Sequence, residues 1–141
     1  MSKHFAKAVW KGNLPKGTGT YTLKSSGYEG KINFQSRFED GKESSPEELI
    51  GAALASCFSM ALTHALDQDG ATPESIETDA EVTLAKTGDS FSVTEIFLKT
   101  KGKVPGIEAE KFKNKAKEAK DTCPISRALQ TVHIKLEAEL L

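Results

Sequence analysis

The chain of 141 residues contains two cysteines, and their settings differ. Cys57 lies inside the apolar stretch SSPEELIGAALASCFSMAL, and Cys123 directly precedes a proline in KDTCPISRAL. Because a thiol reacts as its thiolate, a nucleophilic cysteine near neutral pH needs a cation or oriented dipoles beside it. The two thiols therefore suggest nucleophilic or redox chemistry, with a pair of buried structural cysteines as the simpler alternative.

Cations that could stabilise a thiolate are few, because the chain has two arginines against seventeen lysines. An arginine is always charged and presents a rigid fork of donors. We expect Arg37 at the end of an apolar strand, just before the loop that leads to the cysteine helix. Arg127 follows Cys123 by four residues, and both a structural role and an effect on Cys123 are open. The spacing of Cys57 and His64 is not that of a zinc site, so we expect a core or interface histidine and no metal.

Strand patterns precede, separate and follow two long helical patterns. Alternating residues predict strands at about 5–10, 18–23 and 31–38, then at 76–85, 90–101 and 132–140. Residues 12–17 and 87–89 have turn compositions that suit hairpins. This order predicts a single α+β domain over residues 1–141, with largely antiparallel sheets and two main helices.

The first long helix has clear signals at both ends. Ser45, Pro46 and Glu48 form a capping box with a proline at the first helical position, and Gly70 predicts the end after about residue 69. The helix is apolar on most sides, so we expect it to be buried, with cover from a second subunit. The second helix is predicted at residues 108–122, with an apolar stripe that ends at Cys123.

Two longer motifs resemble a known family. PEELIGAALASCFSMAL (residues 46–62) resembles the first cysteine motif of the osmotically inducible protein C family (OsmC/Ohr), and TCPISRAL (residues 122–129) resembles its second. FQSRFEDG and KAVWKGNLPKGTG resemble the OsmC branch rather than the organic-hydroperoxide-resistance branch. The likeness covers nearly the whole chain and implies an OsmC-like fold that forms an intertwined homodimer, with its sites at the subunit interface.

The resemblance implies a cysteine-based peroxidase without a metal or organic cofactor. Such an enzyme reduces organic hydroperoxides, and hydrogen peroxide more weakly, to alcohols in defence against oxidative or osmotic stress. Cys57 matches the peroxidatic cysteine, which becomes a sulfenic acid, and Cys123 matches the resolving cysteine, which closes a Cys57–Cys123 disulfide. Arg37 matches the arginine that stabilises the thiolate, and Glu47 matches the acid that holds this arginine. An external dithiol, either a small molecule or a lipoyl- or thioredoxin-type protein, resets the cycle.

Glu47 also has a simpler role as a first-turn acid that stabilises the helix start. Ten residues of straight helix place it about 15 Å along the axis from Cys57. We therefore expect the Arg37–Glu47 pair to act on Cys57 of the other subunit, unless the chain bends.

The composition excludes some partners and leaves two other functions open. A net charge of -1 gives no electrostatic case for nucleic acid or an anionic membrane. The first residues lack the apolar segment of a signal peptide, and no apolar stretch is expected to reach the roughly 20 residues of a membrane span. We expect a cytoplasmic protein with reduced thiols. The alternatives are a small-molecule binding protein with idle thiols and a redox sensor; a cysteine hydrolase is weaker, because His4 and His133 have no visible link to Cys57.

Overall fold

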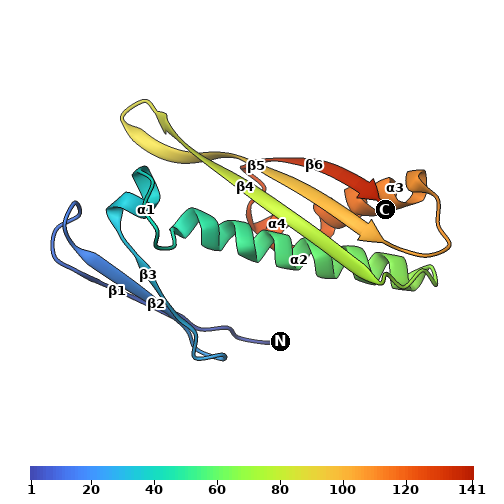
Figure 1. Cartoon of the computed structure of the whole chain (residues 1–141), viewed down its shortest axis with the longest axis horizontal. Coiled ribbons are helices and arrows are strands. Elements are labelled where there is room, and N and C mark those ends of the chain that lie inside the picture. Colours follow the sequence, from blue (N-terminus) through green and yellow to red (C-terminus); the bar gives the residue numbers. More distant parts are fainter. The chain divides into compact units, whose positions relative to one another are not determined.

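The computed structural model describes residues 1–141, which form two compact units, residues 1–49 and residues 50–141. Six strands and four helices follow in the order β1-β2-β3-α1-α2-β4-β5-α3-α4-β6 (Figure 1). The strands form two three-stranded sheets, β1-β2-β3 and β4-β5-β6. This mixture confirms the predicted α+β class with two main helices. The prediction of a single domain stays a prediction.

The first sheet is an antiparallel meander of β1 (Ala6–Lys11), β2 (Thr18–Leu23) and β3 (Glu29–Ile32), with β2 in the centre. Asn13 closes the predicted turn between β1 and β2: its carbonyl accepts from the Gly17 N–H at 2.8 Å, and its side chain accepts from the Lys16 N–H at 2.9 Å. Tyr21 on β2 is buried over Gly30 on β3, where an added Cβ would meet the ring at 2.2 Å. Glycine is therefore the residue that fits beneath this ring.

The third predicted strand is wrong after residue 32. The chain leaves β3 at Asn33, whose side chain accepts from the Ser36 N–H at 2.8 Å and caps the short helix α1 (Phe34–Phe38). Phe34 and Phe38 are four residues apart, so their rings meet across one helical turn, with centroids 4.9 Å apart. Arg37 therefore lies in a helix and not at the end of a strand. The cap at Asn33 overrides the alternating pattern.

Helix α2 (Pro46–Gln68) begins and ends as the sequence predicts. The Glu48 N–H donates to the Ser45 hydroxyl at 3.1 Å, and the Ser45 N–H donates to the Glu48 carboxylate at 3.2 Å, which is the reciprocal capping box. Gly70 ends the segment with a φ of +74°, a conformation that costs glycine little.

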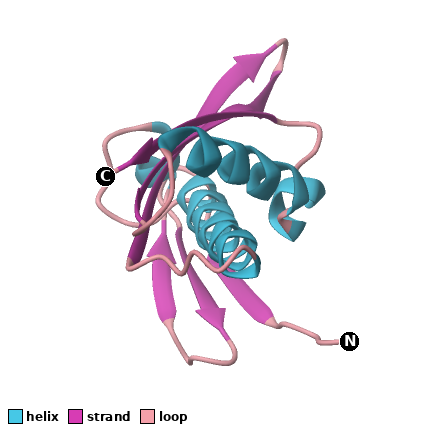
Figure 2. Cartoon of the chain, turned by 90° about the vertical axis from the view of Figure 1, so that its right-hand side faces the viewer, coloured by secondary structure: helices cyan, strands magenta, loops and turns pink.

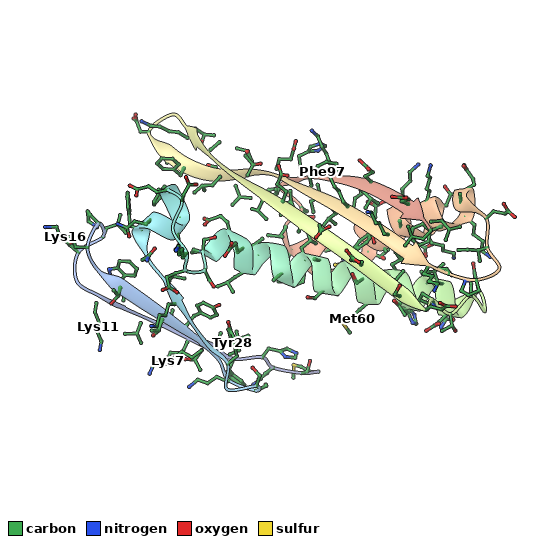
Figure 3. All side chains as sticks on the ribbon, viewed as in Figure 1. Lys7, Lys11, Lys16, Tyr28, Met60 and Phe97 are labelled. Atoms are coloured by element: carbon green, nitrogen blue, oxygen red, sulfur yellow. The ribbon has the colours of Figure 1, made fainter.

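The two faces of α2 differ in exposure. One face carries Leu54, Phe58, Leu62 and Leu66, which are fully buried. The other carries small and apolar residues that are exposed, and Met60 points away from the sheet β4-β5-β6 (Figure 3), with 74% of its surface exposed. A single chain thus buries one face of α2, and cover of the other face by a second subunit stays a prediction.

The length of α2 corrects a second expectation. Its 23 residues are long and apolar enough to cross a membrane, by length and composition alone. The core helix of a water-soluble protein passes the same criterion, and α2 supplies much of the core of its unit.

The second sheet contains β4 (Ser75–Thr87), β5 (Ser90–Lys103) and β6 (His133–Leu140), with β5 in the centre. β4 and β5 form the predicted antiparallel hairpin, whose turn contains Gly88 at a φ of +64°. β6 pairs with β5 in parallel, because α3 and α4 carry the chain back to the same end of the sheet.

Helices α2 and α3 (Ala109–Thr122) lie on the same face of this sheet (Figure 2). Phe112 of α3 lies against Gly102 of β5, where an added Cβ would meet the ring at 2.4 Å. The Ser59 hydroxyl of α2 donates to Thr78 of β4 at 2.8 Å. The short helix α4 (Pro124–Ala128) follows α3 directly. This packing fixes the two segments that carry the cysteines.

Candidate active site

Cys57 lies in the middle of α2, beside the buried stripe of that helix. Its side chain is half-buried and packs against the core of residues 50–141. Its neighbours Leu54 and Phe58 are fully buried, so the thiol has an apolar setting. Backbone N–H groups in the middle of a helix are already engaged in the helix, so α2 itself offers this sulfur no donor.

Cys123 lies at the junction of α3 and α4 and has no exposed surface. Its N–H donates to the Ala119 carbonyl at 3.0 Å and completes α3, and Pro124 begins α4, where its missing N–H has no cost. The sulfur accepts from the Ser126 N–H at 3.5 Å. The junction therefore provides Cys123 with the Ser126 donor, while the Ile125 backbone donates to both sulfurs.

The two thiols lie together although they are far apart in the sequence. Both are free, and their side chains lie close enough for each to shift the pKa of the other. Such contact is what a sulfenic acid on one cysteine needs in order to condense with the other. The geometry suits a pair that alternates between dithiol and disulfide.

The pKa values of the two thiols are shifted in opposite directions. Burial raises the pKa of Cys57 above its ordinary value, and the hydrogen bond and charge of Cys123 raise it further, against a smaller lowering by the Ile125 backbone N–H. Burial also opposes ionisation of Cys123, but hydrogen bonds from Cys57, from the backbone and hydroxyl of Ser126 and from the backbone of Ile125 outweigh it and lower the pKa of Cys123. The surroundings within one chain therefore favour the charged form of Cys123 more than that of Cys57.

The second predicted pair, Arg37 and Glu47, forms a close ion pair within residues 1–49. Arg37 Nε and Nη2 both lie 2.9 Å from Glu47 Oε1. The Arg37 side chain is 42% exposed, whereas that of Glu47 is 9% exposed. Glu47 Oε2 is buried without a hydrogen-bond partner. The carboxylate thus holds the guanidinium through one oxygen and keeps a free acceptor, while Arg37 keeps N–H donors for another group.

The four predicted site residues thus form two pairs. The thiol pair belongs to residues 50–141, and the Arg37–Glu47 pair belongs to residues 1–49. Arg127 and His64 are exposed.

Ser126 was not predicted as a site residue from the sequence. This residue is 6% exposed, and its hydroxyl has no partner by hydrogen-bond geometry, although the same hydroxyl lowers the pKa of Cys123. The two findings agree if the hydroxyl faces the sulfur and donates fully only to a thiolate. The signal was present, because Ser126 stands three residues after Cys123, where the backbone N–H meets a capping side chain.

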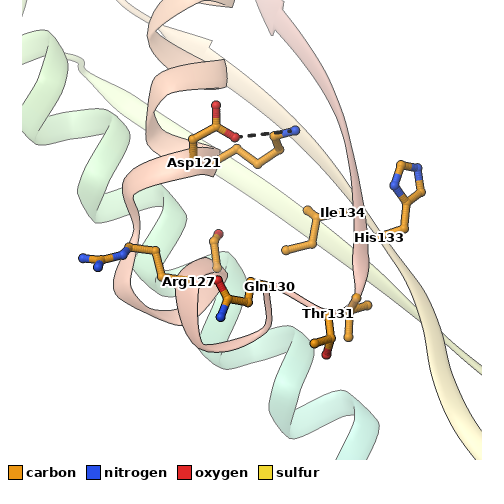
Figure 4. Close-up of a pocket in the computed structure, with 9 residues that line it drawn as sticks. Asp121, Arg127, Gln130, Thr131, His133 and Ile134 are labelled. Carbon is orange, nitrogen blue, oxygen red and sulfur yellow. Dashed lines mark ion pairs between the residues drawn. The ribbon is translucent and has the colours of Figure 1, made fainter.

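A pocket of about 540 Å³ lies beside α4 (Figure 4). It is lined by the end of α3, by α4 and by the start of β6, and Ser126 is the lining residue next to Cys123. The Lys120 ammonium lies 3.8 Å from Asp121, and Arg127 points away from His133 (Figure 4). Neither cysteine lines this pocket. No group of three His, Cys, Asp or Glu side chains in the chain could hold a metal ion.

The chain is similar in sequence to two named bacterial proteins. It is 44% identical to the peroxiredoxin OsmC of Escherichia coli, over 88% of this chain and 87% of the relative. It is 31% identical to an organic hydroperoxide resistance protein-like 1 of Staphylococcus epidermidis, over 72% of this chain and 74% of that protein.

Solved structures show the same fold at lower identity. An OsmC-like protein of unknown function from Vibrio cholerae superposes with a TM-score of 0.80 at 19% identity, over 98% of this chain and 99% of that one. The organic hydroperoxide resistance protein OhrB of Bacillus subtilis superposes with a TM-score of 0.71 at 22% identity, over 97% of this chain and 98% of that one. The model of the OsmC-like protein family matches residues 39–138, which include Glu47 and both cysteines. The chain belongs to the OsmC-like protein family.

Proposed function

We propose that this protein is a thiol-dependent hydroperoxide reductase that uses Cys57 as the nucleophile and Cys123 as the resolving thiol. The observation that carries the proposal is the pair of free, adjacent cysteines in a chain 44% identical to a peroxiredoxin. The apolar setting of Cys57 favours organic hydroperoxides over hydrogen peroxide, because an organic substituent gains from contact with apolar side chains.

The cycle has three steps. The Cys57 thiolate attacks the terminal oxygen of the hydroperoxide, the O–O bond breaks, and the alkoxide leaves as an alcohol after taking a proton. Cys123 then attacks the sulfur of the Cys57 sulfenic acid, releases water and closes the disulfide. An external dithiol supplies two electrons and returns both cysteines to thiols.

Arg37 and Glu47 are the groups that activate Cys57. Burial and the neighbouring Cys123 raise the pKa of Cys57, so the nucleophile requires a cation from elsewhere. Arg37 supplies a permanent charge and free donors for the thiolate and for the departing oxygen, and Glu47 holds it in place. We assign this pair to Cys57 of the partner subunit, since ten residues of helix separate Glu47 from Cys57.

A homodimer is the expected assembly. The exposed face of α2 is mostly apolar and carries Ala52, Ala53, Ser56 and Met60. All of β1, including Val9 and Trp10, is likewise exposed. Apolar surfaces of this kind are typical of protein interfaces. Light scattering on the purified protein should give twice the 15.2 kDa mass of the chain, and a monomeric mass would contradict this assignment. We place the dimer in the cytoplasm, where a dithiol reductant is available.

The experiment that tests the cycle compares wild type with Cys123→Ser after one equivalent of an organic hydroperoxide. Wild type should form the Cys57–Cys123 disulfide, detected by mass spectrometry of peptides. The variant should instead accumulate a Cys57 sulfenic acid that dimedone traps, because no second thiol is present. Thr122→Val removes an exposed hydroxyl beside Cys123 and should behave as wild type. A variant that forms no sulfenic acid, or a wild type that forms no disulfide, would contradict the cycle.

A further inference from the structure

The disulfide of the proposed cycle can be opened at either sulfur, and the surroundings of the two sulfurs are not equivalent. Cys123 has no exposed surface, whereas Cys57 is half-buried. Thiol–disulfide exchange requires the incoming thiolate to touch the sulfur that it attacks. Access therefore favours attack at Cys57.

The stability of the leaving thiolate also favours attack at Cys57. The sulfur of Cys123 accepts from the Ser126 N–H at 3.5 Å, and hydrogen bonds from the Ser126 hydroxyl and from the Ile125 backbone also favour its charged form. The Ile125 backbone also donates to Cys57, but α2 itself offers Cys57 no further donor, and both donors of Ser126 serve Cys123 alone. The better stabilised thiolate leaves faster in exchange.

Ser126 has a feature that packing alone does not explain. Its side chain is buried at 6% exposure, and its hydroxyl lacks a partner that meets hydrogen-bond geometry. A buried hydroxyl without a partner is costly, and a Cys123 thiolate beside it is a strong acceptor. The hydroxyl is thus placed to gain a hydrogen bond when Cys123 becomes charged.

We propose that the dithiol reductant attacks the sulfur of Cys57 and expels Cys123 as a thiolate, with Ser126 as the positioning residue that stabilises the departing sulfur. This inference rests on the proposed Cys57–Cys123 disulfide. The first reductant thiolate forms a bond to Cys57 sulfur while the Cys57–Cys123 bond breaks, and the electron pair of that bond leaves on Cys123. The second thiol of the reductant, as its thiolate, then attacks its own mixed disulfide, releases Cys57 thiolate and leaves as a cyclic disulfide.

The sulfur that the reductant attacks can be identified in the wild-type protein. We would close the disulfide with diamide, add an excess of the monothiol 2-mercaptoethanol, quench with acid and alkylate with N-ethylmaleimide. Trypsin cleaves after Lys120 and after Arg127, so Cys123 and Cys57 lie on different peptides. The expected early product carries mercaptoethanol on Cys57 and maleimide on Cys123.

The outcomes separate this inference from the proposed function. Mercaptoethanol on Cys123, or in equal amounts on both cysteines, would overturn the inference. A disulfide that diamide closes but an organic hydroperoxide does not would contradict the peroxidase cycle and leave the direction of attack measurable. Failure of both oxidants to close the disulfide would overturn the inference as well as the cycle.

The role of Ser126 has a separate test. Ser126→Ala should slow reduction of the disulfide by about threefold or more at neutral pH, because the departing thiolate loses a donor. In a Cys57→Ser background, where Cys123 is the remaining thiol, the same change should raise its pKa, measured by the ultraviolet absorbance of the thiolate. Ser126→Thr keeps a hydroxyl and should restore the rate of disulfide reduction and the pKa of Cys123. Thr122→Val should leave this rate and this pKa unchanged. Unchanged values in Ser126→Ala would overturn the positioning role.

Discussion

At the scale of single residues, the two cysteines have different chemical needs. Cys123 receives donors from the backbone of the residues that follow it, whereas Cys57 has an apolar setting and a raised pKa. The reactivity of Cys57 therefore depends on a group outside its own helix. Arg37 is suited to this role, because Glu47 holds it through one carboxylate oxygen and leaves guanidinium donors free.

Arg37→Lys tests that role, since lysine keeps the charge but loses the fork of donors. We expect the rate of Cys57 oxidation by an organic hydroperoxide to fall by about tenfold or more, measured by stopped flow. The pH profile of the rate should shift upward, because Cys57 thiolate then requires a higher pH. Arg127→Lys changes the chain's other arginine, which is exposed, and should leave rate and profile unchanged. Equal rates in wild type and Arg37→Lys would contradict the assignment.

Much of the site could be predicted from residue types, but the contact of Ser126 with Cys123 could not. The cysteine motifs and the scarcity of arginine identify Cys57, Cys123 and Arg37, and the structure brings the two thiols together and pairs Arg37 with Glu47. The spacing of Ser126 after Cys123 suits a cap, but the effect of its hydroxyl on the thiol depends on burial and on the bend between α3 and α4, which spacing alone does not show.

At the scale of elements, α2 links stability to the site, since the same helix carries Cys57 and a buried leucine stripe. Leu62 of this stripe is fully buried, whereas Leu14 in the turn after β1 is 57% exposed. Leu62→Ala should lower the free energy of unfolding by about 2–5 kcal/mol, because it leaves a cavity. Leu14→Ala should change it by less than about 0.5 kcal/mol. Urea denaturation measures both, and similar losses would contradict the described core.

The contact between the end of α2 and α3 should respond to pH. Asp69 accepts from Lys115 at 3.1 Å and from Lys111 at 3.3 Å, and these hydrogen bonds lower its pKa. A group with a lowered pKa in the folded state stabilises the protein above its unfolded pKa of about 3.9, and this effect is lost as the pH falls through the folded value.

Asp69→Asn should therefore lower the urea midpoint at neutral pH, by a small amount because the side chain is exposed to solvent. The difference from wild type should shrink as the pH falls below the unfolded pKa of aspartate. Glu137→Gln, which removes an acid without an ion pair, serves as the control. A difference that stays constant at all pH values would contradict this account.

Elements with a capping signal were predicted closely, and one element with a mixed signal was not. Ser45, Glu48 and Gly70 fix the bounds of α2 through local hydrogen bonds and a positive φ, so sequence suffices. The alternation over residues 31–38 predicted a strand, but Asn33 caps a helix there. A short cap outweighs a short alternating pattern, because five residues of alternation fit a helical turn almost as well.

At the scale of the whole molecule, the exposed apolar face of α2 is the feature that sequence could not resolve. The sequence showed a helix apolar on most sides and predicted burial with cover from a second subunit, and a single chain buries one face. Burial of the other face depends on what covers it. We assign the remaining cover to the second subunit of a homodimer.

Shared active sites can be tested by mixing two inactive variants. Cys57→Ser and Arg37→Ala subunits, unfolded and refolded together, form heterodimers in which one site has an intact Cys57 and an intact partner Arg37. Statistical mixing makes half of the dimers heterodimers with one active site each, so about a quarter of wild-type activity should return. Each variant refolded alone is the control. Mixed dimers without activity would contradict a site built from both subunits.

The most direct test of the central claim is steady-state peroxide consumption with a dithiol reductant, in wild type and in Cys57→Ser. The account predicts turnover of cumene hydroperoxide by wild type, slower turnover of hydrogen peroxide, and no turnover of either by the variant. A folded and reduced wild type that consumes neither peroxide would contradict the account, and so would a Cys57→Ser variant that retains appreciable activity.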